Sequence, residues 1–358
     1  MAYDIHQLLE AMIENGASDL HLHVGRAPSL RVSGSVVSIE GAALTPEDTE
    51  ALVQSITPPE QLERLKRDGG CDYGFSFHKK ARFRVNVYRG KGVLGMVLRL
   101  IPAKMFTLEQ LRLPPMIKDL LRRPRGLILV TGPTGSGKST TLASMIDWLN
   151  QNEDGHIVTI EDPIEYTFKD EKSLFQQREI GLDVPSFDLA IKSVLRQNPD
   201  IILIGEMRDK ETFETAISAA ETGHLVISTM HASTVKQALT RLFEFFPPEQ
   251  IEQARRQIAG SLRGFVCQKL IPAIEGGGRF AAHEILIADA MVSNLILDGQ
   301  NEKIQQMLET NSDAGSKAFN KDIYRLIKEG KISKADGLRF SPNPQALEMN
   351  LKGIFFKS

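Results

Sequence analysis

A short run of glycines that ends in a lysine and a serine is the part of this sequence with the most specific chemistry. Residues 132–139 read Gly-Pro-Thr-Gly-Ser-Gly-Lys-Ser. Glycines let a backbone curl until several amide hydrogens point at one anion, and the N-terminus of a following helix adds positive charge. In this pattern the lysine reaches the β- and γ-phosphates and the serine hydroxyl binds Mg²⁺. The spacing predicts a loop for ATP and Mg²⁺ formed by Gly132, Pro133, Thr134, Gly135, Ser136, Gly137, Lys138, Ser139 and Thr140.

Two carboxylates follow apolar runs at positions that suit ATP hydrolysis. The apolar run 201–204 is followed by Gly205-Glu206, and the run 157–160 by Glu161. Parallel strands place their carboxyl ends at one edge of a sheet, where the phosphate loop also lies. A carboxylate there can bind Mg²⁺ or orient the attacking water. We predict that Glu206 and Glu161 are catalytic and metal-binding; the alternatives are a helix-capping acid and a surface acid.

Two histidines and three arginines are further candidates for contacts to the phosphates. His224 and His231 bracket an apolar strand, where a histidine can donate to a phosphate, although a structural role is also compatible. Arg82 and Arg84 alternate with apolar residues and so project from one face of a strand, and Arg99 ends another strand. These arginines form either a solvated sheet face or a cationic face offered to a phosphate site of another subunit. An arginine that reaches the phosphate site of another subunit raises the rate of phosphoryl transfer by about 10³–10⁵.

The composition excludes several classes of protein. With 42% hydrophobic and 25% charged residues among 358, the chain resembles globular proteins large enough for two domains. Its formal net charge of -2 gives no support to a nucleic-acid partner. We expect no transmembrane segment and no signal peptide, because there is neither a run of about 18 apolar residues nor a basic start followed by an apolar stretch. Two distant cysteines, Cys71 and Cys267, favour a reduced, cytoplasmic setting.

The distribution of helix-like, strand-like and proline-rich stretches divides the chain into four parts. Residues 1–101 alternate short helices and strands and predict an α+β domain. Residues 102–125 contain four prolines and predict a linker. In residues 126–288 strand-like and helix-like runs alternate, which predicts an α/β core with a parallel sheet. Residues 289–358 read as a C-terminal helical appendage whose last part is hard to assign.

Several long motifs resemble the secretion-type motor ATPases, and specifically the retraction motors of type IV pili and twitching motility. The similarity extends from about residue 3 to residue 340. Its motifs lie at 17–22, 82–87, 125–127, 159–165, 177–179, 195–200, 205–209 and 220–225.

The resemblance implies a RecA-like ATPase domain after an N-terminal PAS-like domain, and a ring of six identical subunits. It assigns Glu161 to an acidic box, Glu206 to the Walker B motif, and His224 and His231 to a histidine box. The family's N-terminal arginines correspond to Arg82, Arg84 and Arg99, which the resemblance therefore favours as contacts to nucleotide. It also implies a cytoplasmic protein, peripheral to the inner membrane through a platform protein of the pilus.

One departure from the family concerns the C-terminal helices. Motors of the PilT type carry Ala-Ile-Arg-Asn-Leu-Ile-Arg-Glu, whereas residues 291–298 read Met-Val-Ser-Asn-Leu-Ile-Leu-Asp, without either arginine. Other segments look closer to the PilU-like accessory motors, which act with a paralogous retraction ATPase. Two functions follow as expectations: an ATP-hydrolysing hexameric motor that powers or assists retraction, or a nucleotide-binding accessory subunit with little turnover. A DNA translocase and a small-molecule kinase fit the charge and the acidic motifs less well.

Overall fold

The computed structural model describes residues 3–32, 34–78, 80–101, 105–275, 277–310 and 315–354. The chain forms two compact units. Unit 1 contains Met1–Met105, Ile160–Phe168 and Gln177–Leu189, and unit 2 contains Phe106–Thr159, Lys169–Gln176 and Ala190–Ser358. None of the helices in the described ranges is long and apolar enough to cross a membrane.

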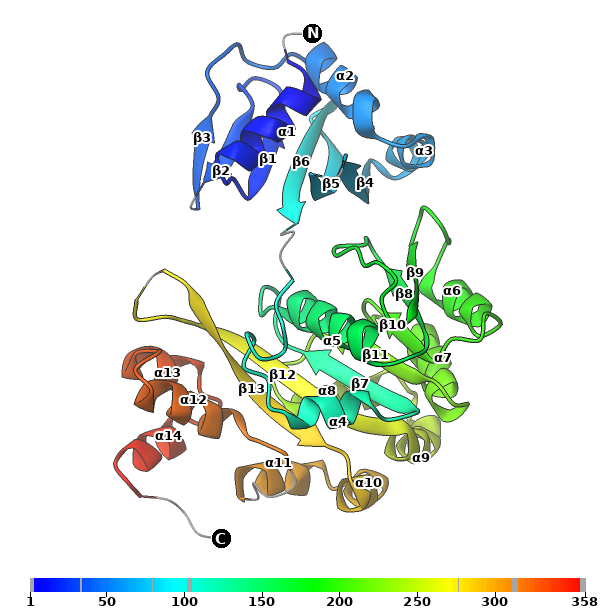
Figure 1. Ribbon diagram of the computed structural model, residues 1–358, viewed down its shortest axis with the longest axis vertical. Helices are drawn as coiled ribbons and strands as arrows, with labels where there is room; N and C mark the ends of the chain where they lie inside the picture. Colours follow the sequence, from blue (N-terminus) through cyan, green and yellow to red (C-terminus); the bar gives the residue numbers. More distant parts are fainter. Residues whose placement is uncertain are drawn as a thin grey trace. The chain divides into compact units, whose positions relative to one another are not determined.

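Unit 1 is built on a six-stranded antiparallel sheet in the order β3-β2-β1-β6-β5-β4 (Figure 1). A capping box between Thr45 and Asp48 starts α2. The apolar core includes Leu9, Phe83 and Leu98, from a helix and two strands. Its elements are α1 (Ile5–Glu14), β1 (Asp19–Leu22), β2 (Ser29–Val32), β3 (Ser35–Ser38), α2 (Pro46–Ile56), α3 (Pro59–Asp68), β4 (Gly70–Phe77), β5 (Ala81–Gly90) and β6 (Val93–Ile101).

A buried carboxylate explains why residues 177–189 group with unit 1 although they follow the phosphate loop in sequence. Glu179 is buried and accepts hydrogen bonds from the backbone N–H of Gly74 (2.9 Å) and of Ile164 (3.1 Å). Its Oε2 also pairs with Arg82 Nη2 at 3.0 Å. The bonds to Gly74 and Arg82 join segments about a hundred residues apart. The division of the chain therefore differs from the predicted continuous core over 126–288.

Unit 2 is built on a seven-stranded sheet in the order β13-β12-β7-β11-β10-β8-β9. Strand β7 (Gly126–Thr131) runs parallel to β11 (Leu225–Met230), which runs parallel to β10 (Ile201–Ile204). Every residue of these three strands is buried, as expected when helices cover both faces of a parallel sheet. The other strands are β8 (His156–Glu161), β9 (Leu174–Glu179), β12 (Leu262–Pro272) and β13 (Arg279–Ile287).

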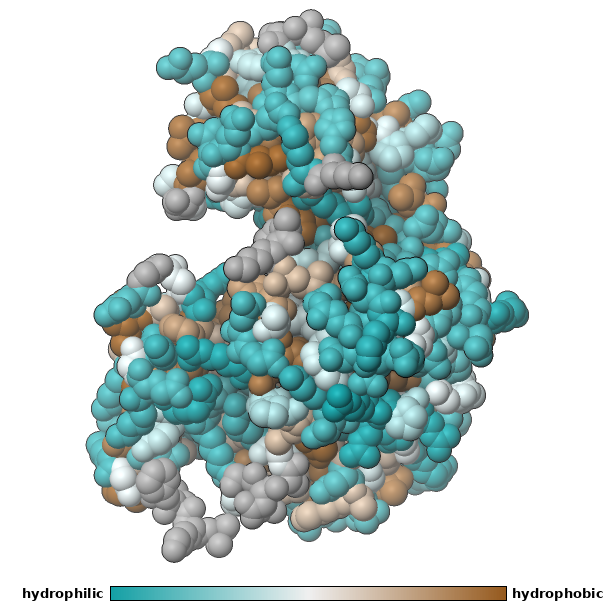
Figure 2. Space-filling view, in the orientation of Figure 1, coloured by the Kyte–Doolittle hydropathy of each residue, from teal (hydrophilic) through white to brown (hydrophobic). Residues whose placement is uncertain are grey.

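The helices of unit 2 pack on this sheet and on one another (Figure 1). Helices α5 and α7 contact β7 and β11, while α8 contacts β12 and β13. Figure 2 shows mostly hydrophilic side chains on the visible surface of unit 2. The helices are α4 (Met116–Leu121), α5 (Lys138–Asn152), α6 (Phe187–Val194, shared with unit 1), α7 (Lys210–Glu221), α8 (Val235–Glu244), η1 (Pro248–Gln250), α9 (Ile251–Ser261), α10 (Ala290–Leu297), α11 (Asn301–Thr310), α12 (Phe319–Lys328), α13 (Lys334–Phe340) and α14 (Pro344–Leu351).

Two parts of the chain differ from the sequence prediction. Residues 106–121, expected within the linker, belong to unit 2, because Leu108, Leu113 and Ile117 are buried in it. Residues 102–104 of that linker lie outside the described ranges. At the other end, Pro344–Leu351 forms α14, capped by the side chain of Asn343, in the part of the chain that was hard to assign from its residues.

Candidate functional site

The phosphate loop connects β7 to α5, as the sequence predicts. Gly137 caps the helix with φ +90°, a conformation that side-chain-bearing residues rarely adopt. A Cβ at Gly132 would lie 2.5 Å from the carbonyl oxygen of Gln268, so only glycine fits there. The Lys138 ammonium folds back on the loop and donates to the carbonyl oxygens of Gly132 (2.9 Å) and Pro133 (3.2 Å).

The loop has the properties that a phosphate chain requires. The hydroxyl oxygen of Ser136 is buried and has no hydrogen-bond partner among the described residues. Ser139, predicted to bind Mg²⁺, is exposed at the start of α5, so its oxygen is accessible. In the described part of the chain no three His, Cys, Asp or Glu side chains form a metal cluster. A Mg²⁺ ion here would therefore take most of its oxygen ligands from phosphates and water, as this ion commonly does.

Glu206 lies at the same edge of the sheet as the loop. The parallel register matches Ile204 of β10 with Ser228 of β11, and Ser228 with Leu129 of β7, so the strands end together. Burial lowers the pKa of the Lys138 ammonium, and the nearby Glu206 carboxylate opposes that shift. The structure thus brings these two predicted residues together.

The Glu206 carboxylate is held between the side chains of His231 and Arg208. Its Oε1 lies 2.9 Å from Nε2 of His231, and its Oε2 accepts from Nε of Arg208 at 2.8 Å. The Glu206 side chain remains 19% exposed. Arg208, which we did not single out from the sequence, follows Glu206 by two residues; that proximity was the available signal. The arrangement fixes the direction of the carboxylate while leaving part of it open to a ligand.

The two predicted histidines lie at opposite edges of the sheet. His231 follows the C-terminal end of β11, beside Glu206, whereas His224 precedes the N-terminal end of the same strand. His224 Nδ1 contacts the carbonyl oxygen of Ala219 at 2.9 Å, and its own carbonyl accepts from Gly126 at the start of β7. Six residues of strand span about 20 Å. Within one chain, His224 therefore does not join the site that contains His231.

Glu161 and the three predicted arginines belong to unit 1. Glu161 ends β8 and accepts from the side-chain amide of Gln177 at 3.1 Å. Arg82 is bound by Glu179, by the carbonyl oxygen of Ile164 (2.8 Å) and by Ser76 (2.8 Å), and only 18% of its side chain is exposed.

The other two arginines of unit 1 are more accessible than Arg82. Arg84 and Arg99 are cross-strand neighbours on β5 and β6. Arg84 has only long ion pairs, at 3.7 Å to Asp72 and 3.9 Å to Glu165. Arg99 contacts Asp19 at 2.8 Å, yet 68% of its side chain is exposed. Of the three predicted contacts to nucleotide, Arg84 and Arg99 therefore keep the freedom that such a role needs.

The chain matches a described protein family and curated relatives over most of its length. The sequence model of a family described as type II/IV secretion system protein matches residues 1–281. The type IV pilus ATPase PilU of Pseudomonas aeruginosa is 37% identical over 98% of this chain and 91% of its own length. The pilus retraction ATPase PilT of the same organism is 40% identical over 96% of this chain and 99% of its own length.

Solved structures are similar over nearly the whole chain. The pilus retraction motor PilT with bound ADP has a TM-score of 0.89 and 42% identity, and the match covers 97% of this chain and 99% of that one. The ATPase DotB of Legionella pneumophila has a TM-score of 0.82 and 27% identity, and the match covers 98% and 95%. These matches confirm the predicted α/β fold class.

Proposed function

We infer that this chain, which belongs to the type II/IV secretion system protein family and is an ATPase, works as a motor in type IV pilus retraction. The observation that carries this inference is the grouping of Lys138, Glu206 and His231 at the loop edge of the sheet. A relative and a solved structure named for pilus retraction match almost the full chain, which supports the process in which the motor acts.

The proposed mechanism uses the residues of unit 2 for binding and for water activation. The loop amides and Lys138 bind the phosphate chain. Mg²⁺, when bound, would be held through Ser139 and Glu206 and would supply charge neutralisation at the transferred phosphoryl group. Glu206 orients the attacking water and receives its proton, because its carboxylate is held in direction by His231 and Arg208.

We propose that the active form is a homo-hexamer on the cytoplasmic side of an inner membrane, bound to a platform protein of the pilus. In such a ring Arg84 and Arg99 of another copy would contribute cationic groups to the phosphates. Arg82 is the weaker candidate of the three, since its contacts inside unit 1 hold it. In this mechanism His224 takes part only through a contact with a neighbouring copy of the chain.

A second candidate function is that of an accessory subunit that assists a paralogous retraction ATPase. The observation that favours it is the absence of both arginines from residues 291–298. The equivalent helix α10 instead exposes apolar side chains, with Met291 56% exposed.

Steady-state phosphate release and native mass, measured on the same preparation, test the proposed function. We expect ATP turnover that stops when Mg²⁺ is chelated, and a sixfold mass that ATP stabilises. A chain that stays monomeric with ATP would contradict the ring. Turnover that appears only after a partner retraction ATPase is added would favour the accessory function.

A further inference from the structure

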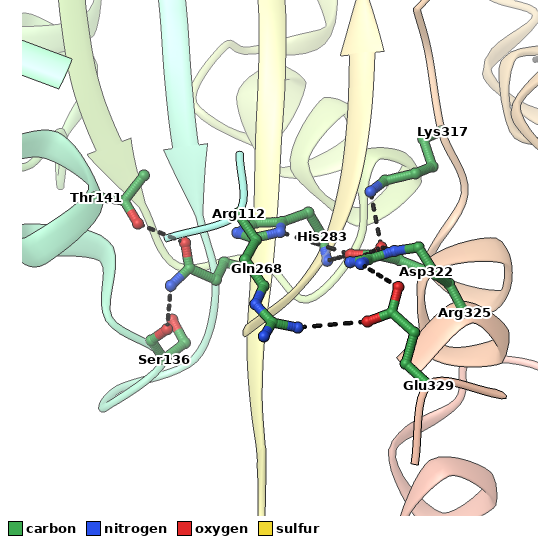
Figure 3. A network of polar contacts seen from close by, with 9 residues as sticks. All are labelled: Arg112, Ser136, Thr141, Gln268, His283, Lys317, Asp322, Arg325 and Glu329. Atoms are coloured by element: carbon green, nitrogen blue, oxygen red, sulfur yellow. Dashed lines mark hydrogen bonds and ion pairs between the residues drawn. The ribbon is translucent and has the colours of Figure 1, made fainter. Parts of the chain in front are cut away.

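A buried glutamine lies directly against the phosphate loop from the neighbouring strand β12. Gln268 is 2% exposed. Its side-chain NH₂ donates to the carbonyl oxygen of Ser136 at 2.7 Å, and its side-chain oxygen accepts from the hydroxyl of Thr141 at 2.6 Å (Figure 3). A carbonyl oxygen can only accept, so the contact to Ser136 identifies which end of the amide carries nitrogen. Both ends of the Gln268 amide are thus bound to the loop and its helix.

The contact to Ser136 controls the direction of the next amide. A trans peptide is planar, so the carbonyl of Ser136 and the N–H of Gly137 point in opposite directions. Because Gln268 binds the carbonyl oxygen of Ser136, the N–H of Gly137 points away from Gln268. Loop amides that point inward are the groups that bind phosphate in such loops.

The close packing of strand β12 against the loop and its flanking residues supports this orientation of the Gly137 amide. A Cβ at Gly137 would lie 2.8 Å from Nε2 of Gln268, so the glycine leaves room for the glutamine as well as for a ligand. Thr141, in the first turn of α5, is also fully buried. One residue earlier on β12, Cys267 Sγ accepts from the hydroxyl of Thr131 at 2.9 Å, just before the loop. Strand β12 therefore contacts the chain before, within and after the loop.

We propose that Gln268 is a positioning residue for the phosphate loop. It sets the direction of the Gly137 amide and the place of the first turn of α5, and through them the affinity for the phosphates of a nucleotide. The inference rests on the proposed function, because it concerns nucleotide bound at this loop. The two ends of its amide bind the loop and the first turn of α5, so one side chain fixes both parts of the phosphate site.

The test compares variants of the full chain by ADP affinity, by KM and kcat for ATP, and by the unfolding temperature without nucleotide. Gln268→Met has a similar length and cannot form hydrogen bonds. Gln268→Glu keeps the shape but replaces the donor that Ser136 needs. Thr141→Val removes the second partner at nearly constant volume. Gln257→Met is the matched control, because Gln257 lies half-buried on α9, away from the loop, with its side-chain nitrogen 3.5 Å from Oε2 of Glu221.

We expect Gln268→Met and Gln268→Glu to weaken ADP binding about 10- to 100-fold, the usual effect of leaving buried polar groups unpaired. KM for ATP should rise with kcat much less affected, the pattern of lost ground-state binding. Thr141→Val combined with Gln268→Met should bind ADP no worse than Gln268→Met alone, because the threonine acts through the glutamine. Gln257→Met should behave as the wild type.

The inference is overturned if Gln268→Met folds and binds ADP as tightly as the wild type, or if its loss of affinity adds independently to that of Thr141→Val. Should Gln268→Met not fold, Thr141→Val alone decides: unchanged ADP affinity contradicts the inference and weakened affinity supports it. A wild-type chain that binds no ADP would instead refute the proposed function itself.

Discussion

Two carboxylates of unit 2, Glu206 and Asp322, lie among basic side chains, and their surroundings differ in a way that separates chemistry from structure. Glu206 at the loop edge contacts His231 and Arg208 and has a partly exposed side chain. Asp322 on α12 is 0% exposed. It accepts from the backbone N–H of His283 (2.9 Å), from Lys317 (2.8 Å) and from Arg325 (2.8 Å), as Figure 3 shows.

A carboxylate with both oxygens bound from inside the fold, such as that of Asp322, has no position left for a ligand. Asp322 joins α12 to β13 and so fastens the C-terminal helices to the sheet. Burial alone would raise the pKa of Asp322, but His283 and Lys317 hold it well below its usual range. Glu206, in contrast, keeps an open side next to the phosphate loop.

The largest expected effect is on catalysis by Glu206. Glu206→Gln should lower kcat by about 10²–10⁴, because an amide cannot receive the proton of the attacking water. ADP affinity should stay near the wild-type value, since the loop itself is unchanged. Glu252→Gln, at an exposed position of α9, is the control. Phosphate release at saturating ATP is measured for the wild type and for both variants. An unchanged kcat of Glu206→Gln would exclude Glu206 from the mechanism.

The opposite pattern is expected for Asp322. Asp322→Asn should destabilise the fold by about 3 kcal/mol, because the cationic groups of Lys317 and Arg325 lose a buried partner. The kcat of folded protein should not change. Asp298→Asn, at the exposed end of α10, is the control. Denaturant unfolding and ATP turnover on the same samples separate the two effects, and a selective loss of kcat would contradict the structural role.

The acid dependence of stability sharpens this prediction. The pKa of Asp322 is lowered in the folded state, so its stabilising contribution is complete above the unfolded pKa of about 4. As the pH falls below that value the unfolded chain takes up the proton first, and the contribution is lost. The stability difference between the wild type and Asp322→Asn should therefore shrink in acid; a constant difference down to the lowest pH would be inconsistent with the lowered pKa.

A smaller effect is expected for His231. His231→Asn removes the contact to Oε1 of Glu206 and should lower kcat about tenfold, the effect of losing one hydrogen bond to a charged group. The KM for ATP should change less than kcat. An equal effect on ADP binding would mean that His231 contributes to affinity instead of orienting Glu206.

The smallest effect is expected for His224. His224→Asn should leave the turnover of a single chain almost unchanged, because His224 lies at the far edge of the sheet and an amide can replace its contact to Ala219. Turnover measured across protein concentration checks this. A large loss confined to the assembled protein would assign His224 to an interface between copies.

The parts predicted well from the sequence are those that local patterns determine. Strand β10 has the predicted bounds of 201–204, because four consecutive buried apolar residues signal a parallel strand. The loop and α5 follow from the spacing of glycines and lysine. Strands β12 and β13 were not predicted, since buried polar residues such as Gln268 and Glu284 interrupt their apolar pattern.

The parts that sequence could not reveal depend on contacts between distant segments. Glu179 binds Gly74, and Gln268 binds Ser136, across more than a hundred residues in each pair. No local period encodes such bonds. The same limit applies to His224 and His231: the sequence indicates two histidines around one strand, but only the direction of the strand shows that they lie at opposite edges.

The most direct test of the central claim compares ATP hydrolysis by the wild type and by Lys138→Ala, both with Mg²⁺ and both checked for folding. We expect steady phosphate release by the wild type and none above background by Lys138→Ala, because the variant lacks the cation that binds the phosphates. Equal rates in the two proteins would show that hydrolysis does not take place at this loop.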